Sequence, residues 1–219
     1  TGITGRIGAN LAAALVHRGH RVRGLVWPGD PRVEKLHGLG AELHYGSLSE
    51  KEAVHKAVED VEAVYHLGAA FQGGGPFSEE DYFEINVRGT FNMLEACRAQ
   101  NGLQQFLFAS TDALYEKYVP GGMKEPIDEE APRKPRGGYA LSKSMGEELC
   151  NGFWRGYALP ATILRFAMVF GAGEILEFPQ FYLSKLRGSD PKLEALWENE
   201  ERLVLLMDEQ GRFFKKHIA

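Results

Sequence analysis

Tyr139 and Lys143 stand four residues apart in the segment Tyr139-Ala-Leu-Ser-Lys143. On a helix this spacing places both side chains on one face, one turn apart. A phenol ordinarily titrates near pH ~10, which is too high for proton transfer at neutral pH, and a neighbouring ammonium lowers that pKa. The spacing therefore predicts that Tyr139 exchanges a proton with a hydroxyl or carbonyl group.

The chain opens on three regularly spaced glycines, Gly2, Gly5 and Gly8, and an apolar helical pattern follows at once. A glycine loop that leads into a helix N-terminus binds anions, because free backbone N–H groups and the helix dipole both point at the ligand. The loop therefore predicts a bound dinucleotide. Such a loop normally follows a buried strand, so we expect the first strand of the fold to precede Thr1.

Strand-like and helix-like segments must position these groups, and they alternate along the chain. Ser49 and Glu52 are spaced as a capping box, and Ser78 is placed as an N-cap. The expected strands are residues 20–26, 41–45, 63–69, 106–109 and 161–166, and the expected helices are residues 49–58, 78–100 and 139–157.

Continuous apolar strands between amphipathic helices indicate a parallel sheet covered on both faces. With the glycine loop at the first strand–helix turn, they predict an α/β, doubly wound, Rossmann-like fold over residues 1–171. Residues 120–135 are rich in proline, glycine and charge, which is typical of a long active-site loop. Residues 172–219 are expected to begin a smaller substrate-binding region that continues past Ala219.

The composition narrows the functional classes. The 219 residues carry a formal net charge of −5 with no dominant basic stripe, which argues against a nucleic-acid partner. Cys97 and Cys150 are far apart and form no Cys-x-x-Cys pair, so neither a disulfide framework nor a metal site is expected. No apolar run approaches the roughly 18 residues that span a bilayer. A cytoplasmic protein without membrane contact is expected.

The glycine loop and the Tyr139–Lys143 pair together resemble the short-chain dehydrogenase/reductase superfamily, in its extended, epimerase/dehydratase-like branch. Four further segments resemble motifs of that family and occur in the expected order. They are His66-Leu-Gly-Ala-Ala70, Asn86-Val-Arg-Gly-Thr90, Ala109-Ser-Thr-Asp-Ala-Leu-Tyr115, and Leu164-Arg-Phe166 continuing to Phe170-Gly171.

This resemblance implies roles for individual side chains. Tyr139 would be the general acid/base, and Lys143 would lower its pKa and bind the nicotinamide ribose. Thr111 would hydrogen-bond the substrate oxygen, with Ser110 as the alternative, and Asp112 would act as an acid or cap the strand end. Besides Tyr139 and Lys143, the implied cofactor contacts are Gly2, Thr4, Gly5, Arg6, Ile7, Gly8, Ser47, Leu48, Leu67, Gly68, Ala69 and Phe166.

The function that the resemblance implies is NAD(P)-dependent oxidation, reduction or epimerisation at a hydroxyl or carbonyl carbon of a small sugar-like substrate, nucleotide sugars included. Two alternatives stay open: reduction of a small non-sugar carbonyl compound, and a non-catalytic, dinucleotide-binding regulatory protein. A homodimer through the helices at residues 78–100 and 139–157 is also expected from the resemblance.

Several positions depart from the family pattern. Val26 stands where an acidic residue usually binds the adenosine ribose, so NAD and NADP both remain open; Arg32 could bind a 2′-phosphate or be a solvated loop residue. Ser47 replaces an aspartate that contacts adenine. Ala113 replaces a glutamate of the dehydratases, which favours epimerisation or reduction over dehydration. Met168 replaces an asparagine that contacts a substrate diphosphate, so it favours a smaller or apolar substrate, or fills the core.

His66 and Asn86 also carry side chains that could do chemistry. His66 ends a buried strand, so a structural, hydrogen-bonded histidine is expected there. Asn86 is either a helix-packing residue or part of a proton relay.

Overall fold

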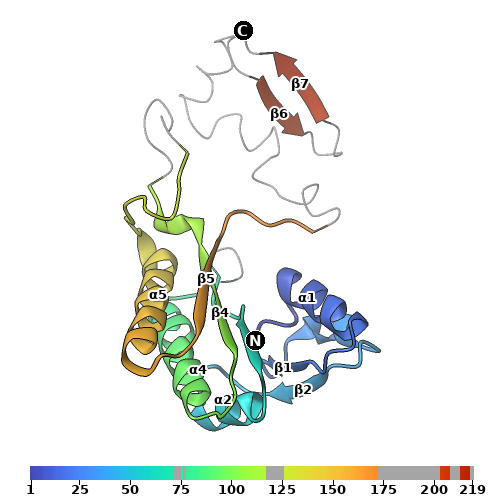
Figure 1. Cartoon of the computed structure of the whole chain (residues 1–219). Coiled ribbons are helices and arrows are strands. Elements are labelled where there is room, and N and C mark those ends of the chain that lie inside the picture. The colour runs from blue at the N-terminus through green and yellow to red at the C-terminus, as the bar shows by residue number, and fades with distance from the viewer. Residues whose placement is uncertain (72–74, 76, 117–125, 172–202, 208–212, 218–219) are drawn as a thin grey trace. The chain divides into compact units, whose positions relative to one another are not determined.

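The computed structural model describes residues 1–71, 75, 77–116, 126–171, 203–207 and 213–217. The chain divides into two compact units, Thr1–Met168 and Val169–Ala219. In the second unit, the described strands β6 (Leu203–Met207) and β7 (Phe213–His217) form an antiparallel pair (Figure 1). Residues 120–125 of the expected active-site loop, and most of the expected region 172–219, lie outside the described residues.

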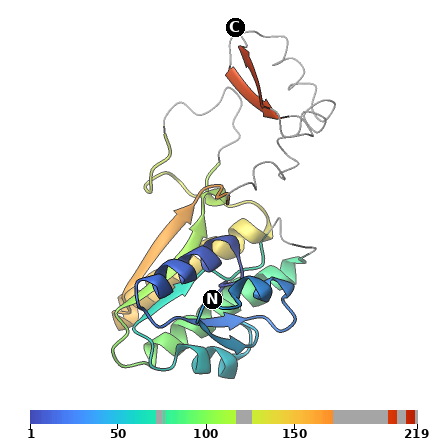
Figure 2. The same ribbon diagram turned by 90° about the vertical axis from the view of Figure 1, so that its right-hand side faces the viewer.

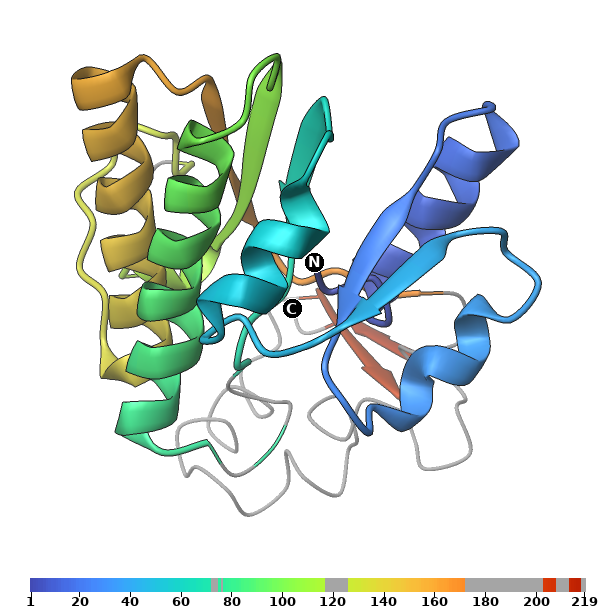
Figure 3. The same cartoon turned by 90° about the horizontal axis from the view of Figure 1, so that it is seen from below.

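Five parallel strands in two groups form the framework of the first unit. β1 (Arg23–Val26) pairs with β2 (Glu42–Tyr45), and β4 (Gln105–Thr111) pairs with β3 (Ala63–His66) and with β5 (Ala161–Phe166). Figure 3 shows the two groups with β1 and β3 on their facing sides. No hydrogen bond joins the two groups among the described residues. The predicted parallel α/β fold is confirmed.

Helices cover both faces of these strands. α2, α4 and α5 lie on one side, and α1 lies on the other, in front of the strands in Figure 2. None of the described helices is long and apolar enough to cross a bilayer. The helices are α1 Arg6–His17, α2 Lys51–Val58, α3 Glu79–Asp81, α4 Gly89–Arg98 and α5 Gly137–Tyr157, with single-turn or irregular helices η1 Pro31–Leu36, η2 Tyr82–Arg88 and η3 Asp112–Leu114.

Two strands are three residues shorter than predicted, and one predicted cap is wrong. β1 begins at Arg23 rather than His20, and β3 ends at His66 rather than Ala69. α2 has Glu50 at its N-cap and no side-chain cap, so the Ser49–Glu52 capping box does not form. The reason is a competing local bond, because the Ser49 hydroxyl lies 2.8 Å from the Ser47 hydroxyl.

Residues 78–100 were expected to form one α-helix and instead form three helical segments. The predicted N-cap at Ser78 is confirmed, and it forms a capping box with Asp81. The middle segment, η2, is a π-helix. The Thr90 hydroxyl donates to the Asn86 carbonyl oxygen one turn earlier, at 2.5 Å, and such a bond competes with the regular helix ladder. π-Helical turns are frequent at functional sites.

The largest apolar cluster binds α2, α4 and α5 to the strands. Phe106 and Phe108 of β4 are fully buried there, together with Leu94 of α4 and Cys150 of α5. α5 approaches β4 closely because it carries Gly146 opposite Phe108. A Cβ atom at Gly146 would lie 3.1 Å from Cε1 of the Phe108 ring and closer still to Cζ.

Replacing Gly146 with alanine is therefore expected to destabilise the fold, by about 1–3 kcal/mol, because the buried Phe108 ring cannot move aside. Gly152 of the same helix is the matched control. A Cβ atom at Gly152 meets nothing within 4 Å, so Gly152→Ala is expected to stabilise by about 0.5–1 kcal/mol through helix propensity. Denaturant unfolding of both variants checks this. Equal effects of the same sign would contradict it.

Candidate functional site

The predicted catalytic residues, and the predicted cofactor contacts that follow β3 and end β5, lie at the carboxyl ends of β3, β4 and β5. β3 ends at His66, β4 at Thr111 and β5 at Phe166, and the register places Thr111 directly beside Phe166. Leu67, Gly68 and Ala69 follow β3 immediately. Ligands of open α/β sheets bind outside this edge.

Tyr139 and Thr111 form the centre of the site. Tyr139 lies near the start of α5 and is 9% exposed, and its side chain hydrogen-bonds with that of Thr111. The Thr111 oxygen accepts a bond from the Ala113 backbone N–H at 3.1 Å. Its hydroxyl proton is therefore available to donate, either to the Tyr139 oxygen or to an oxygen of a bound substrate.

The pKa of Tyr139 is raised, and this corrects the sequence prediction. Burial of the phenol is the largest cause, the hydrogen bond from Thr111 opposes it, and the negative charge of Asp112 adds to it. Lys143 was expected to lower this pKa, but its ammonium is directed to the Ala109 carbonyl oxygen. Tyr139 is therefore a protonated acid at neutral pH in this structure.

Lys143 is a buried cation one turn along α5. It is 4% exposed, its Nζ donates to the Ala109 carbonyl oxygen at 2.8 Å, and it lies 4.9 Å from the centre of the Phe108 ring. Burial lowers the pKa of Lys143 to about 8. An ammonium in this position can still bind hydroxyl groups of a ligand, because an ammonium has three donors and one is used on Ala109.

Ser110 is committed elsewhere. Its hydroxyl donates to Glu147 at 2.6 Å, and both side chains are buried. Thr111 is therefore the hydroxyl that faces Tyr139. Glu147 was missed in the sequence, although its position four residues after Lys143 continues the same helix face.

The glycine loop is packed too tightly for side chains at two of its glycines. Gly2 has a φ of +67°, and a Cβ atom there would lie 2.6 Å from the Gly68 backbone nitrogen. A Cβ atom at Gly8 would overlap the Gly2 carbonyl group. Gly5 is the N-cap of α1 and provides no side-chain cap for the first turn, which begins at Arg6 and Ile7. A bare helix N-terminus of this kind fits the pyrophosphate of a dinucleotide.

A chain of buried hydrogen bonds joins this loop to the helices. Thr90 donates to the Asn86 carbonyl oxygen, so it accepts at its own oxygen from His66 Nε2, 3.0 Å away. His66 Nδ1 then accepts from the Thr1 hydroxyl at 2.8 Å, and that hydroxyl accepts from the Gly68 N–H. This is a neutral imidazole, in agreement with its pKa, which burial holds well below the ordinary value. The expected structural histidine is confirmed.

Asn86 connects the same edge to the helix that carries Tyr139. Its side chain pairs with both backbone groups of Ala70, at 2.7 and 3.0 Å, and donates to the Ser142 hydroxyl at 2.9 Å. Ser142 in turn donates to the Tyr139 carbonyl oxygen. These contacts give Asn86 a packing role between the loop after β3 and α5.

A carboxylate missed in the sequence analysis lies against the glycine loop. Asp30, in the loop after β1, is buried and accepts from the Thr4 hydroxyl at 2.7 Å. It also accepts from the backbone and from both side-chain nitrogens Nε and Nη2 of Arg32, at 2.8–3.0 Å. These hydrogen bonds, that from Arg32 first, hold the pKa of Asp30 far below its usual range. Arg32 is thus paired rather than free in solvent.

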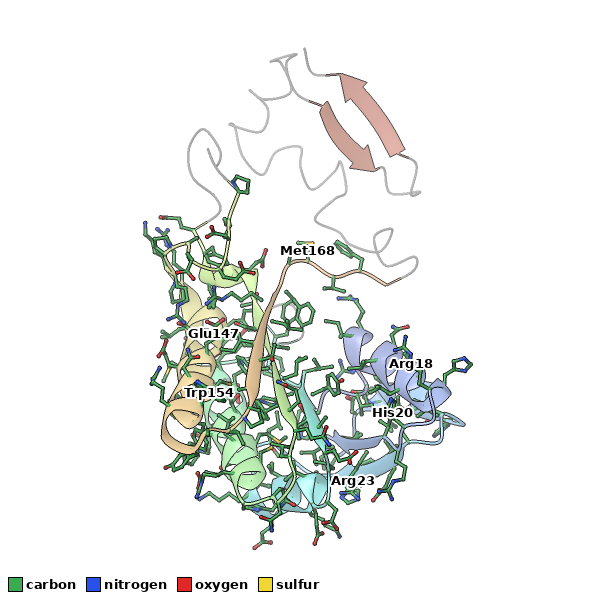
Figure 4. All side chains as sticks on the ribbon, viewed as in Figure 1. Arg18, His20, Arg23, Glu147, Trp154 and Met168 are labelled. Atoms are coloured by element: carbon green, nitrogen blue, oxygen red, sulfur yellow. The ribbon has the colours of Figure 1, made fainter. Side chains whose placement is uncertain are left out.

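Three remaining positions lie at the edges of the site. The Leu48 carbonyl oxygen accepts from Asn92 of α4 at 3.0 Å, and neighbouring Ser47 bonds within its own loop. Met168 follows the carboxyl end of β5 (Figure 4). It is 55% exposed, so it does not fill the core.

Residues 1–188 match the sequence model of the NAD dependent epimerase/dehydratase family. The chain belongs to this family. The match confirms the family that the motifs indicated, within the short-chain dehydrogenase/reductase superfamily.

Individual relatives agree with this assignment. The UDP-N-acetyl-alpha-D-glucosaminuronate decarboxylase of Bacillus cytotoxicus is 34% identical over 87% of this chain and 61% of its own length. The uronate dehydrogenase of Pseudomonas syringae pv. tomato is 33% identical over 59% of this chain and 44% of its own length. A superfamily member from Agrobacterium tumefaciens, solved with bound NAD, has a TM-score of 0.71 and 32% identity over 100% of this chain and 68% of its own. The chain thus spans less than two thirds of either curated relative.

The buried Lys143 of this family member should cost stability. Its pKa falls from an ordinary 10.5 to about 8 in the folded protein. Below pH 8 Lys143 is charged in both the unfolded and the folded protein, and burying that charge disfavours folding. Lys143→Met is therefore expected to stabilise the protein by about 1–3 kcal/mol at pH 7, and the gain should shrink between about pH 8 and 10.5. Unfolding of both proteins across this pH range measures it.

Lys134→Met is the control, because Lys134 is exposed and its removal should change stability by no more than ~0.5 kcal/mol. A Lys143→Met protein that is less stable than the wild type at every pH would refute the penalty.

Proposed function

We propose that this protein is an NAD-dependent enzyme that oxidises, reduces or epimerises a hydroxyl-bearing carbon of a sugar or sugar acid, with Tyr139 as the general acid/base. The hydrogen-bonded pair Thr111–Tyr139, buried at the carboxyl ends of the strands beside Lys143, is the observation that carries the proposal. A regulatory protein without catalysis has no need of a buried cation and a raised phenol pKa in one place.

Each residue has a distinct task. Thr111 donates to the substrate oxygen and so orients the reacting carbon. Tyr139 holds the proton on its phenolic oxygen when it acts as an acid, and it accepts the hydroxyl proton when positive charge nearby favours the phenolate. Lys143 and the glycine loop are the groups that would hold NAD. When bound, NAD supplies the acceptor or donor of hydride.

Sugar acids are the proposed substrate class. Both curated relatives named above carry a uronate in their names, and the solved relative binds NAD. The exposed Met168 beyond β5 supports a substrate without a diphosphate, because a thioether offers no strong hydrogen bond to phosphate oxygens. The same observation favours the second candidate, reduction of a small non-sugar carbonyl compound. The expected homodimer and cytoplasmic location stay predictions.

A substrate panel tests the activity. Free hexuronates, UDP-hexuronates, UDP-hexoses and small ketones are incubated with the protein and cofactor. A change in nicotinamide absorbance indicates net oxidation or reduction, and an isomeric product without such a change indicates epimerisation.

Tyr139→Phe is expected to lower turnover at least ~100-fold, with cofactor affinity changed less than ~3-fold, because only the proton transfer is lost.

Tyr157→Phe is the matched control. Tyr157 ends the same helix and is 58% exposed, packed on Phe153 and Arg98, so its hydroxyl should not matter for turnover. Full activity in the Tyr139→Phe protein would disprove the acid/base assignment.

We also propose NAD rather than NADP as the cofactor. The ionised carboxylate of Asp30 touches Thr4 inside the glycine loop, where a 2′-phosphate would add negative charge. Arg32 could neutralise such a phosphate, but its Nε and Nη2 groups are already engaged by Asp30.

Asp30→Asn should narrow the preference for NAD over NADP about tenfold, chiefly by strengthening NADP binding, since it removes the charge and releases Arg32. Titration calorimetry with both cofactors measures this without turnover. Glu34→Gln is the control, because Glu34 lies on η1, the short helix that Asp30 caps, and is largely exposed. A wild-type protein that binds NADP as tightly as NAD would rule the proposal out.

A further inference from the structure

Three side chains of α5 reach three consecutive residues of β4. They stand at four-residue intervals on one face of the helix, which is the spacing of successive turns. The contacts are Tyr139 with the Thr111 side chain, Lys143 Nζ with the Ala109 carbonyl oxygen at 2.8 Å, and Glu147 with the Ser110 hydroxyl at 2.6 Å. Ser110 therefore lies between the two residues that contact the predicted catalytic groups.

Glu147, labelled in Figure 4, is fully buried, and both of its oxygens accept hydrogen bonds. Oε1 accepts from Ser110 and from Arg165 Nε, and Oε2 accepts from Arg165 Nη2 and Arg133 Nη1, all within 2.9 Å. Burial alone would raise the pKa of Glu147, but the hydrogen bonds from Arg165 and Ser110 outweigh it and lower the pKa. The group is a carboxylate at neutral pH.

The two arginines extend this cluster to other parts of the site. Arg165 belongs to β5 and also donates to the Glu129 carbonyl oxygen at 3.0 Å. Arg133 lies near the end of the expected active-site loop, residues 120–135, and also binds Glu148 at 2.7 Å. The Glu147 carboxylate thus connects α5 with the ends of β4 and β5 and with residues 126–136.

The link to Ser110 is not needed to neutralise the arginines. A bidentate pair of Glu147 with Arg165 would hold α5 against β5 by itself. The added bond fixes Ser110, which lies between Ala109, the partner of Lys143, and Thr111, the partner of Tyr139. A displacement of about 1 Å in such a group can slow a reaction ~100-fold.

We propose that Glu147 is a positioning residue for proton transfer, which holds Ala109 and Thr111 in place against Lys143 and Tyr139 through its bond to Ser110. This inference rests on the proposed function. It assigns no contact between Glu147 and substrate or cofactor, because the contacts above account for both carboxylate oxygens.

Glu147→Gln and Ser110→Ala test the proposal. Both are expected to lower kcat about 10- to 100-fold, with KM and the Kd for NAD changed less than ~3-fold. In the pH profile of kcat/KM, the limb that disappears in Tyr139→Phe should move to higher pH, because a loosened Thr111 no longer stabilises the phenolate. Ser110→Ala leaves the carboxylate–arginine pairs intact, so it decides the question if Glu147→Gln does not fold.

Glu148→Gln is the matched control. Glu148 is the next residue of the helix and binds the same Arg133, but its side chain is 53% exposed. Its kcat and pH profile should equal those of the wild type. Variants of Glu147 and Ser110 that lose only thermal stability, with kcat and pH profile unchanged, would overturn the positioning role.

A crystal structure of Ser110→Ala keeps this test separate from the proposed function. The proposal expects the Thr111–Tyr139 contact and the bond from Lys143 to Ala109 to lengthen or break, whether or not a substrate has been found. Both contacts unchanged in the variant would also overturn it.

Discussion

The close contact between α5 and the end of β4 is the constraint on which the rest of the site depends. Gly146 allows the helix to approach the Phe108 ring, because any side chain there would overlap the ring. At that separation Lys143 reaches the Ala109 carbonyl oxygen and Tyr139 reaches Thr111. A core packing requirement at one glycine thus sets how closely Tyr139 and Lys143 approach their partners on β4.

This contact also creates an electrostatic imbalance. Burial raises the pKa of Tyr139 and lowers that of Lys143, so each environment favours the uncharged form. A phenolate and an ammonium become favourable together only when they interact with each other or with added charge. The protein therefore buries two side chains, Tyr139 and Lys143, whose charged forms are both disfavoured. Such a cost in stability is typical of catalytic sites.

Local sequence patterns predicted most elements and the Tyr139–Lys143 face, because helix and strand periodicity depend on near neighbours. The missed groups depend on distant ones. Asp30 bonds to Thr4 across 26 positions, and Ser110 to Glu147 across 37. The predicted cap at Ser49 failed for a different reason, since neighbouring Ser47 offered its hydroxyl a competing partner.

Asp30 shows why a missing motif residue is weak ground for assigning a cofactor. Val26 ends β1 and has no carboxylate, but Asp30 in the following loop places one beside Thr4 of the glycine loop. The short helix η1 makes this possible, because Asp30 is its N-cap and accepts the Arg32 backbone N–H while its other oxygen faces Thr4. A ligand responds to charge at a place in space. A motif sought only at the strand end therefore misses a carboxylate that the following loop brings to the glycine loop.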